Sequence, residues 1–363
     1  MTVTLDLGRA LEAGRRIVAY LPGGGITGGL YQLGALAALE DAVPGFRANA
    51  LHGYVAVGSG AVAAAALAGG LEVQRLYRAL LDPADSFFAL ERRHIIRFDL
   101  AEWRRTFGAA ASALRRAFVS ATSRPVETAV DPWHEIDRFQ DVLPAGIFSL
   151  ETFEHFFESF LERRGVSTTF RALPRPLIVP AWDLDTGELV CFGDKLHAHE
   201  RIARAACASM ALPLFFAPVR IGERLYFSGS AGNATSLDVA VDELGAEIVL
   251  VINPLVPVAA EGQRVPTGHG AGTGVRDKGL LWVYNQAMRI GEHSRLRTGI
   301  ELMKSKRPDV EVAVIEPTQS DAVLFMHSPM NYSARRAILE EAYRSVRERV
   351  RAGLLDCGTP APS

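Results

Sequence analysis

The sequence predicts an α/β protein: a three-layer α/β/α sandwich whose central sheet is mostly parallel. Short apolar runs alternate with helix-like segments along most of the 363 residues, as parallel strands joined by crossover helices do. Two of these runs, 17–21 and 54–57, each lead directly into a glycine-rich turn and a helix-like segment. The run 248–254 is almost uniformly apolar and is the clearest candidate for a buried central strand.

The first part of the chain contains two strand–turn–helix units. Its expected elements, in chain order, are a strand at 17–21, a helix at 29–41, a strand at 54–57, a helix at 61–67 and a helix at 71–81. The last helix is expected to end at Asp82-Pro83, because proline disfavours helical backbone in the residue before it.

Residues 84–165 have a different character. They lack β-branched runs, and bulky apolar residues at helical spacing are interleaved with arginines. We predict a helical cap inserted within one domain that spans residues 1–363. The simpler interpretation is a covering layer with a solvated basic face. The alternative is a lipid-facing surface, because basic amphipathic helices favour anionic membrane interfaces.

Sheet-forming segments resume after the cap. The expected elements are a hairpin of 177–182 with 188–192, a helix at 199–209, a strand at 224–227, a helix at 236–244, a strand at 248–254, a helix at 280–305, a strand at 310–315 and a helix at 333–354. The glycine-rich, polar segment 259–278 predicts a flexible loop, and residues 358–363 predict a frayed tail.

Composition excludes several classes of function. The net charge of −2 gives no reason to expect a nucleic-acid partner. The three cysteines have no paired metal-ligand spacing, so we expect reduced thiols, no metal and no cofactor. No uncharged apolar run approaches the ~20 residues that span a bilayer, and residues 1–11 do not resemble a signal peptide. We expect a cytoplasmic protein, with peripheral contact to a membrane or lipid inclusion as an open alternative.

The two glycine-rich turns suggest acyl-transfer chemistry. The first offers bare backbone N–H groups at a helix N-terminus, which suit an oxyanion or a phosphate. Its residues are Gly23, Gly24, Gly25, Ile26, Thr27 and Gly28. The second turn presents Ser59 between two glycines, as a nucleophile elbow does. The first turn also fits a dinucleotide fingerprint, but that motif needs an acidic residue closing the second strand, which here ends in Val57.

Four segments resemble the patatin-like phospholipase family, and together they extend the likeness over almost the whole chain. They are 23–28, 55–61, 204–215 and 226–230. The resemblance implies a patatin-like sandwich that hydrolyses lipid or acyl esters with a serine–aspartate dyad and no metal. Carried onto this chain, it implies Ser59 as nucleophile, the 23–28 loop as oxyanion hole and Ser228 at the position of the family's aspartate.

Two positions depart from the family pattern. In the G-x-S-x-G elbow, Val57 and Ala61 stand where glycines are usual, and a shift of the register by one residue would put Gly60 at the nucleophile position. At the acid position, a serine hydroxyl cannot accept a proton near neutral pH. Other candidate bases are Asp238, Asp242, Asp183, Asp185, His197 and His199.

Two hypotheses follow for the function. The first is a lipid acyl hydrolase, a serine esterase that acts through Ser59 and is impaired by the missing aspartate. The second is a catalytically silent relative that binds a lipid, an acyl chain or a protein partner. In either case we expect Ser59 to lie close both to the amides of the first glycine turn and to Ser228, because such turns converge at one end of the sheet.

Overall fold

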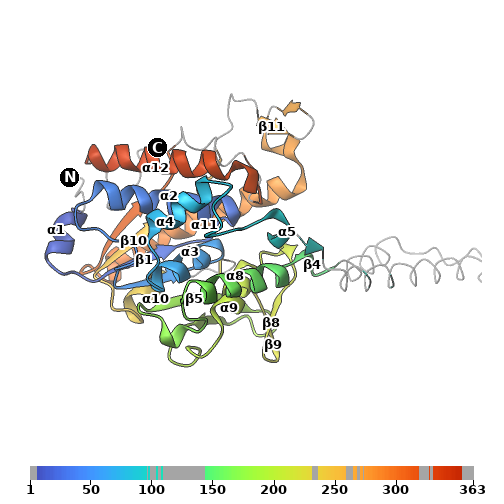
Figure 1. Ribbon diagram of the computed structural model, residues 1–363, viewed down its shortest axis with the longest axis horizontal. Coiled ribbons are helices and arrows are strands. Elements are labelled where there is room, and N and C mark those ends of the chain that lie inside the picture. Colours follow the sequence, from blue (N-terminus) through green and yellow to red (C-terminus); the bar gives the residue numbers. More distant parts are fainter. Residues whose placement is uncertain are drawn as a thin grey trace, which may run out of the picture.

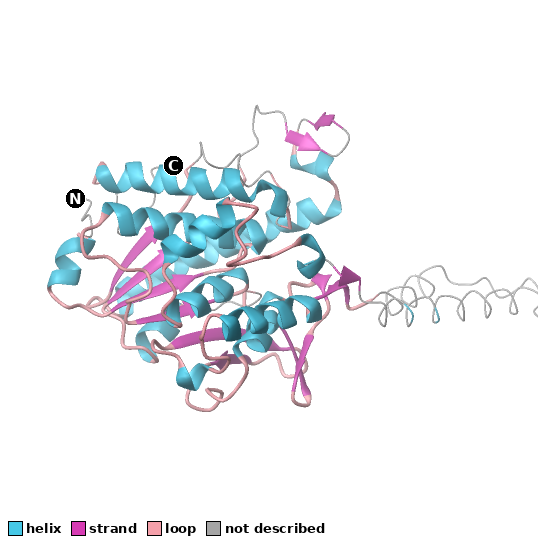
Figure 2. Ribbon diagram, in the orientation of Figure 1, coloured by secondary structure: helices cyan, strands magenta, loops and turns pink. Residues whose placement is uncertain are grey.

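The computed structural model describes residues 6–95, 97–98, 104, 108, 144–230, 236–258, 265–267, 270–272, 274–318, 327 and 330–353. Its main sheet has eight strands (Figures 1 and 2). In spatial order they are β13 (Glu311–Ile315), β10 (Ile248–Ile252), β1 (Ile17–Leu21), β2 (Gly53–Ala56), β5 (Leu177–Asp183), β9 (Arg224–Ser228) and β8 (Val219–Ile221), and β6 (Leu189–Phe192) pairs with β5.

The first five of these strands are parallel to one another, and β6, β8 and β9 are joined to the sheet by antiparallel pairing. The prediction of a mostly parallel sheet is therefore confirmed. The strand at 248–252 lies between two parallel neighbours and all five of its residues are buried. Its uniformly apolar sequence follows from this position, since both of its faces are covered by helices.

Successive side chains of β1 enter two different cores, as the two faces of a strand require. Ala19 and Leu21 belong to one core and Val18 and Tyr20 to the other. Helices in the first core are α2 (Gly25–Ala42), α3 (Ser59–Ala68), α4 (Val73–Leu81), α8 (Glu151–Arg163), α9 (Ile202–Met210) and α12 (Arg335–Arg351). Helices in the second are α10 (Leu237–Asp242) and α11 (Leu280–Lys306), and Trp282 of α11 belongs to the first. The three-layer α/β/α sandwich is thus confirmed (Figure 2).

Several expected boundaries were wrong. Helix α2 begins at Gly25 rather than at 29, so four of the six residues of the first glycine turn are helical. A short helix, α1 (Leu7–Glu12), precedes the sheet and was not predicted. Within 259–278, where a loop was expected, the structure has an antiparallel pair of strands, β11 (Val265–Thr267) and β12 (Gly270–Gly272), and a 3-10 turn, η2 (Val275–Lys278).

The described ends of the cap are not wholly helical. Besides α5 (Arg92–Ile95) and α8, they contain β3 (Arg97–Phe98) and β4 (Gly146–Ser149), which form a small sheet with β7 (Leu214–Phe216). Backbone pairing with β7 outweighed the helical spacing of the apolar residues. Of the stretch 99–143, only 104 and 108 are among the described residues, and the tail at 358–363 lies outside them.

The contact between α2 and α12 depends on Gly34. A Cβ added there would lie 2.7 Å from the Leu339 carbonyl oxygen. Helix propensity alone favours alanine over glycine by about 1 kcal/mol, whereas overpacking costs about 1–3 kcal/mol. We expect Gly34→Ala to lower the free energy of unfolding by about 1–2 kcal/mol in a denaturant titration. Gly274→Ala is the control, because its Cβ would meet nothing within 4 Å; unchanged stability of Gly34→Ala would show that α12 moves away freely.

Candidate functional site

The two glycine turns meet at one edge of the sheet. Strands β1 and β2 are parallel neighbours, so their carboxyl ends, Leu21 and Ala56, lie at the same edge. A Cβ added at Gly58 would be 3.4 Å from the Gly23 Cα, which places the turns in direct contact. In open α/β sheets this edge, beyond the carboxyl ends of the strands, is where ligands bind.

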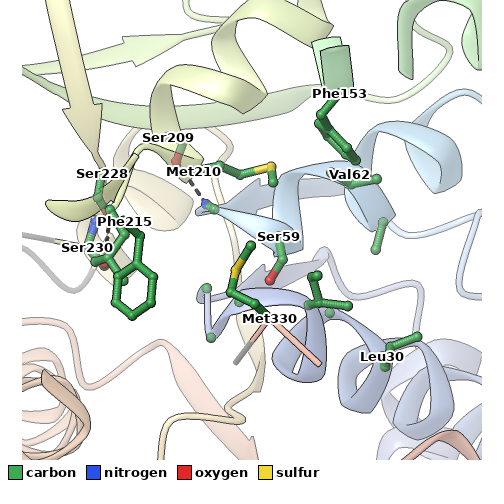
Figure 3. A pocket seen from close by; sticks show the side chains of 18 of the residues that line it. Leu30, Ser59, Val62, Phe153, Ser209, Met210, Phe215, Ser228, Ser230 and Met330 are labelled. Atoms are coloured by element: carbon green, nitrogen blue, oxygen red, sulfur yellow. Dashed lines mark hydrogen bonds between the residues drawn. The ribbon is translucent and has the colours of Figure 1, made fainter. Parts of the chain in front are cut away.

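A cavity of about 150 Å³ opens at this edge (Figure 3). Its walls are mainly apolar side chains from the helices of the first core, among them Leu30, Leu33, Val62, Leu76, Leu80 and Phe153. The side chains with polar atoms that line it are Ser59, Ser209, Ser228, Ser230, Asn285, Glu292 and Tyr332. The cavity is therefore an apolar chamber with a small cluster of hydrogen-bonding groups.

The first glycine turn contributes backbone rather than side chains. Gly24 and Gly25 have φ of 129° and 67°, a region that favours glycine, and Gly24 caps α2 without a side-chain hydrogen bond. Gly23, Gly24, Gly25 and Ile26 line the cavity. Thr27 does not line it, because its side chain is fully buried in α2. Gly28 does not either, and its N–H donates to the Gly24 carbonyl at 3.1 Å.

At Gly58 the second turn has a backbone conformation that is open to glycine but strained for a residue with a side chain, with φ of 58° and ψ of −127°. Its N–H donates to Ser209 Oγ at 2.9 Å. Ser59 comes one residue later, as the first residue of α3, and its Oγ is buried without a hydrogen-bond partner. Gly60 packs so closely on β1 that a Cβ there would lie 2.3 Å from the Leu21 carbonyl oxygen. The sharp point of the turn is thus Gly58, the residue before Ser59. The register shift that the sequence allows would instead have placed it at Gly60, the residue after Ser59.

Ser228 ends β9 and lies at the same cavity, but it is bonded within its own turn. Its Oγ is 2.8 Å from Ser230 Oγ and accepts the Ser230 N–H at 3.3 Å. Figure 3 shows Ser228 and Ser230 beside Phe215, apart from Ser59. The structure therefore brings Ser59, the first turn and Ser228 to one cavity, without a hydrogen bond between the two serines.

Glu292 of α11 is the single carboxylate among the residues that line this cavity. Arg295 donates to its Oε1 at 2.7 Å, and the Ser230 hydroxyl also hydrogen-bonds to it. Burial raises the pKa of Glu292, and these two contacts oppose the rise. The sequence offered no signal for this residue, which is one of two carboxylates in the predicted helix 280–305.

None of the other candidate bases lines the cavity. Asp183 is buried and accepts from Arg224 at 2.7 Å, and this contact, with two backbone N–H groups, holds its pKa below the ordinary value. His197 pairs with Asp194 and His199 with Glu200. Asp185 donates its N–H to Asp183, and Asp238 and Asp242 line a separate cavity.

The part of the chain that the structure describes has no group of three His, Cys, Asp or Glu placed to hold a metal ion. Within that same part, Cys191 and Cys207 are free thiols. Burial raises the pKa of Cys191 to about 11. No helix among the described residues is both long enough and apolar enough to cross a bilayer.

Residues 21–241, more than half of the chain, match the family model described as patatin-like phospholipase. No curated protein matches the sequence.

Three solved structures are similar at low identity. VipD from Legionella pneumophila is 13% identical with a TM-score of 0.37, and the match covers 93% of this chain and 67% of VipD. The type III effector protein ExoU is 14% identical with a TM-score of 0.38, and the match covers 94% of this chain and 54% of ExoU. The complex of SpcU with ExoU from Pseudomonas aeruginosa is 14% identical with a TM-score of 0.34, and the match covers 93% of this chain and 53% of that one. This chain thus spans about half the length of ExoU.

Proposed function

The chain belongs to the patatin-like phospholipase family, and from that premise we propose that it is a catalytically silent member which binds a lipid acyl chain in the cavity at the two glycine turns. The observation that supports this proposal most strongly is the backbone of the second turn. Its strained residue is Gly58, which has no side chain.

A nucleophile elbow holds its nucleophile in strained backbone geometry on a sharp strand-to-helix turn, with small residues two positions before and after. If Gly58 occupies the nucleophile's position, the residues two positions before and after it are Ala56 and Gly60, which are both small. A Cβ at Gly60 would have no room. With Ser59 there, the flanking residue on the strand side would be Val57. The first alignment fits better, and in it Ser59 is the residue after the nucleophile, which contributes a backbone N–H to an oxyanion hole.

The acid is missing as well. Ser228 occupies the family's aspartate position, and a serine hydroxyl cannot act as a base near neutral pH. Glu292 is engaged by Arg295 and Ser230. Losing one member of a catalytic unit costs on the order of 10³–10⁶ in kcat, and here both positions lack the required group.

The cavity itself favours a retained binding role. Its walls are apolar, and each methylene moved from water into such a site contributes about 0.8 kcal/mol. Ser59, Ser209 and the backbone of the two glycine turns lie together on one side of the cavity, so a ligand with one polar end and an apolar tail matches this arrangement.

The second candidate function is the one that the family resemblance implies, a lipid acyl hydrolase acting through Ser59. One observation favours it: Ser59 Oγ lines the cavity without a hydrogen-bond partner, close to the backbone of the first turn. Against it, no described carboxylate or imidazole accepts a hydrogen bond from that hydroxyl, so no base activates it.

The two functions are separated by labelling and turnover on the full-length protein. We expect a dansyl-labelled acyl chain to bind saturably and to be displaced by acyl lipids. We expect a fluorophosphonate probe to leave no adduct on the peptide that contains Ser59, and hydrolysis of p-nitrophenyl octanoate to be equal in wild type and Ser59→Ala. An adduct on Ser59, with activity that Ser59→Ala abolishes, would establish the hydrolase instead.

A further inference from the structure

Two helices begin at the cavity and direct their N-termini towards it. Gly24 and Gly25 of α2 and Gly58 and Ser59 of α3 all line it. The first amides of an α-helix have no acceptor within the helix, and the macrodipole is equivalent to about +0.5 charge at this end. Neither helix has a side-chain cap from its N-cap residue or an acidic residue in its first turn. At α3 the N–H groups of Gly58, Gly60 and Ala61 already donate to Ser209 Oγ, the Val57 carbonyl and the Gly58 carbonyl. The amides left for a ligand are therefore that of Ser59 and those of the first residues of α2.

A hydroxyl without a partner lies at the same place. Ser59 Oγ is buried, and it neither donates nor accepts a hydrogen bond. The one carboxylate of the lining, Glu292, is already paired with Arg295. The polar end of the cavity therefore offers an unpartnered hydroxyl beside the amides at the start of α2, which suits a ligand with acceptor oxygens and a negative charge.

Gly58 leaves space for such a group. A Cβ added there would come no closer than 3.4 Å to Gly23 Cα and 3.7 Å to the Ser209 carbonyl oxygen. In the alignment with Gly58 at the elbow, this is the space that a nucleophile's side chain would take. A carboxylate can occupy it and accept from the backbone of both turns.

The apolar part of the cavity runs beside both helices. Lining residues extend along α2 from Ile26 to Leu33 and along α3 from Ser59 to Ala66. Seven residues of helix measure roughly 10 Å, at 1.5 Å per residue. A cavity of 150 Å³ is the size that takes one benzene ring, so it suits a single chain on the order of six to eight carbons rather than the two long chains of a diacyl lipid.

From these observations we infer that the ligand is a free medium-chain fatty acid, bound as its carboxylate at the N-termini of α2 and α3 with its alkyl chain along Leu30, Leu33 and Val62. This inference rests on the proposed function and narrows its ligand to one chemical class. An ester or an alcohol lacks the negative charge that the two helix ends favour. A long or doubly acylated lipid exceeds the volume.

The test is a titration of the delipidated full-length protein, at neutral pH, with straight-chain acids from butanoate to dodecanoate. Affinity should rise by up to about fourfold per methylene, corresponding to about 0.8 kcal/mol, and reach its maximum near octanoate. Octanoate should bind at least tenfold more tightly than 1-octanol or methyl octanoate. Equal affinity for all three would overturn the carboxylate assignment and leave the proposed function intact. Absence of binding by every compound would refute the proposed function itself, and affinity still rising at dodecanoate would refute the length limit.

A matched pair of variants tests the electrostatic part. Ser59→Asp and Ser59→Asn lengthen the side chain equally, but only the first adds a negative charge. Ser59→Asp should fold, because acidic residues stabilise the first turn of a helix, and thermal unfolding of both variants checks this. Octanoate affinity should be at least tenfold lower in Ser59→Asp than in Ser59→Asn, whereas 1-octanol should not distinguish the two. Equal loss of octanoate binding in both variants would show that the size of the side chain, not its charge, weakens binding, and this would overturn the inference.

Discussion

The double variant Gly58→Ser/Ser228→Asp should hydrolyse p-nitrophenyl octanoate at least about 100-fold faster than the wild-type protein, a difference of ~2.7 kcal/mol in the barrier. The new serine would stand at the strained point of the turn, where a Cβ meets nothing closer than 3.4 Å. The new aspartate would supply the carboxylate that can accept its proton. Steady-state kinetics with the ester measures the gain.

The matched control is Gly58→Ala/Ser228→Asp, which carries the same backbone strain, about 1–3 kcal/mol, and the same carboxylate without the hydroxyl. It should show no gain, and neither should either single substitution, because the two groups act as a unit. If Ser228→Asp alone raised the rate and Ser59→Ala removed it, Ser59 would be the nucleophile and the alignment at Gly58 would be wrong. A folded double variant without activity would also contradict that alignment.

Gly60→Ala should be the most destabilising single methyl addition in the second turn. Its Cβ would lie 2.3 Å from the Leu21 carbonyl oxygen and 2.9 Å from the Leu21 Cβ, so either α3 or the end of β1 must move. Overpacking against backbone cannot be relieved by a rotamer change, and we expect the free energy of unfolding to fall by about 3 kcal/mol. Denaturant titration followed by circular dichroism measures the loss.

Ser59→Ala is the control for that loss, because residue 59 precedes Gly60 in the same helix and already has a Cβ. Removing its hydroxyl, which has no partner, should change the free energy of unfolding by less than about 0.5 kcal/mol. A Gly60→Ala protein as stable as wild type would mean that α3 does not press on β1 as the structure has it. The assignment of Gly60 as the small residue two positions after the elbow would then lose its support.

Most of the layered fold could be predicted from the sequence, because its signals are local. A central parallel strand such as β10 must be apolar on both faces, and that pattern is visible in residues 248–252 alone. A turn of the type at Gly24 and Gly25 needs positive φ, which favours glycine, so the glycines in the sequence predict the turn. Where pairing is not local, prediction failed: β3 and β4 join β7, far along the chain, whereas the sequence predicts a helical cap there.

The candidate site was predicted only in part. The sequence placed Ser59, Ser228 and the first glycine turn at one end of the sheet, and the structure has them at one cavity. It did not locate Glu292, since the position of α11 relative to β9 is a tertiary contact between segments far apart in the chain. It also missed the role of Ser209, whose Oγ accepts the N–H of Gly58 across the space between α9 and the turn.

By itself the sequence determined the alternation of the main parallel strands with helices, the family and the absence of an aspartate at position 228, since each is a matter of residue type and spacing. Only the tertiary structure decided which residue of the second turn has the strained backbone. Three successive residues, Gly58, Ser59 and Gly60, are all compatible with a tight turn. The closeness of α3 to β1 excludes any Cβ at Gly60 and puts the positive φ at Gly58, and this leaves Ser59 in the first turn of the helix.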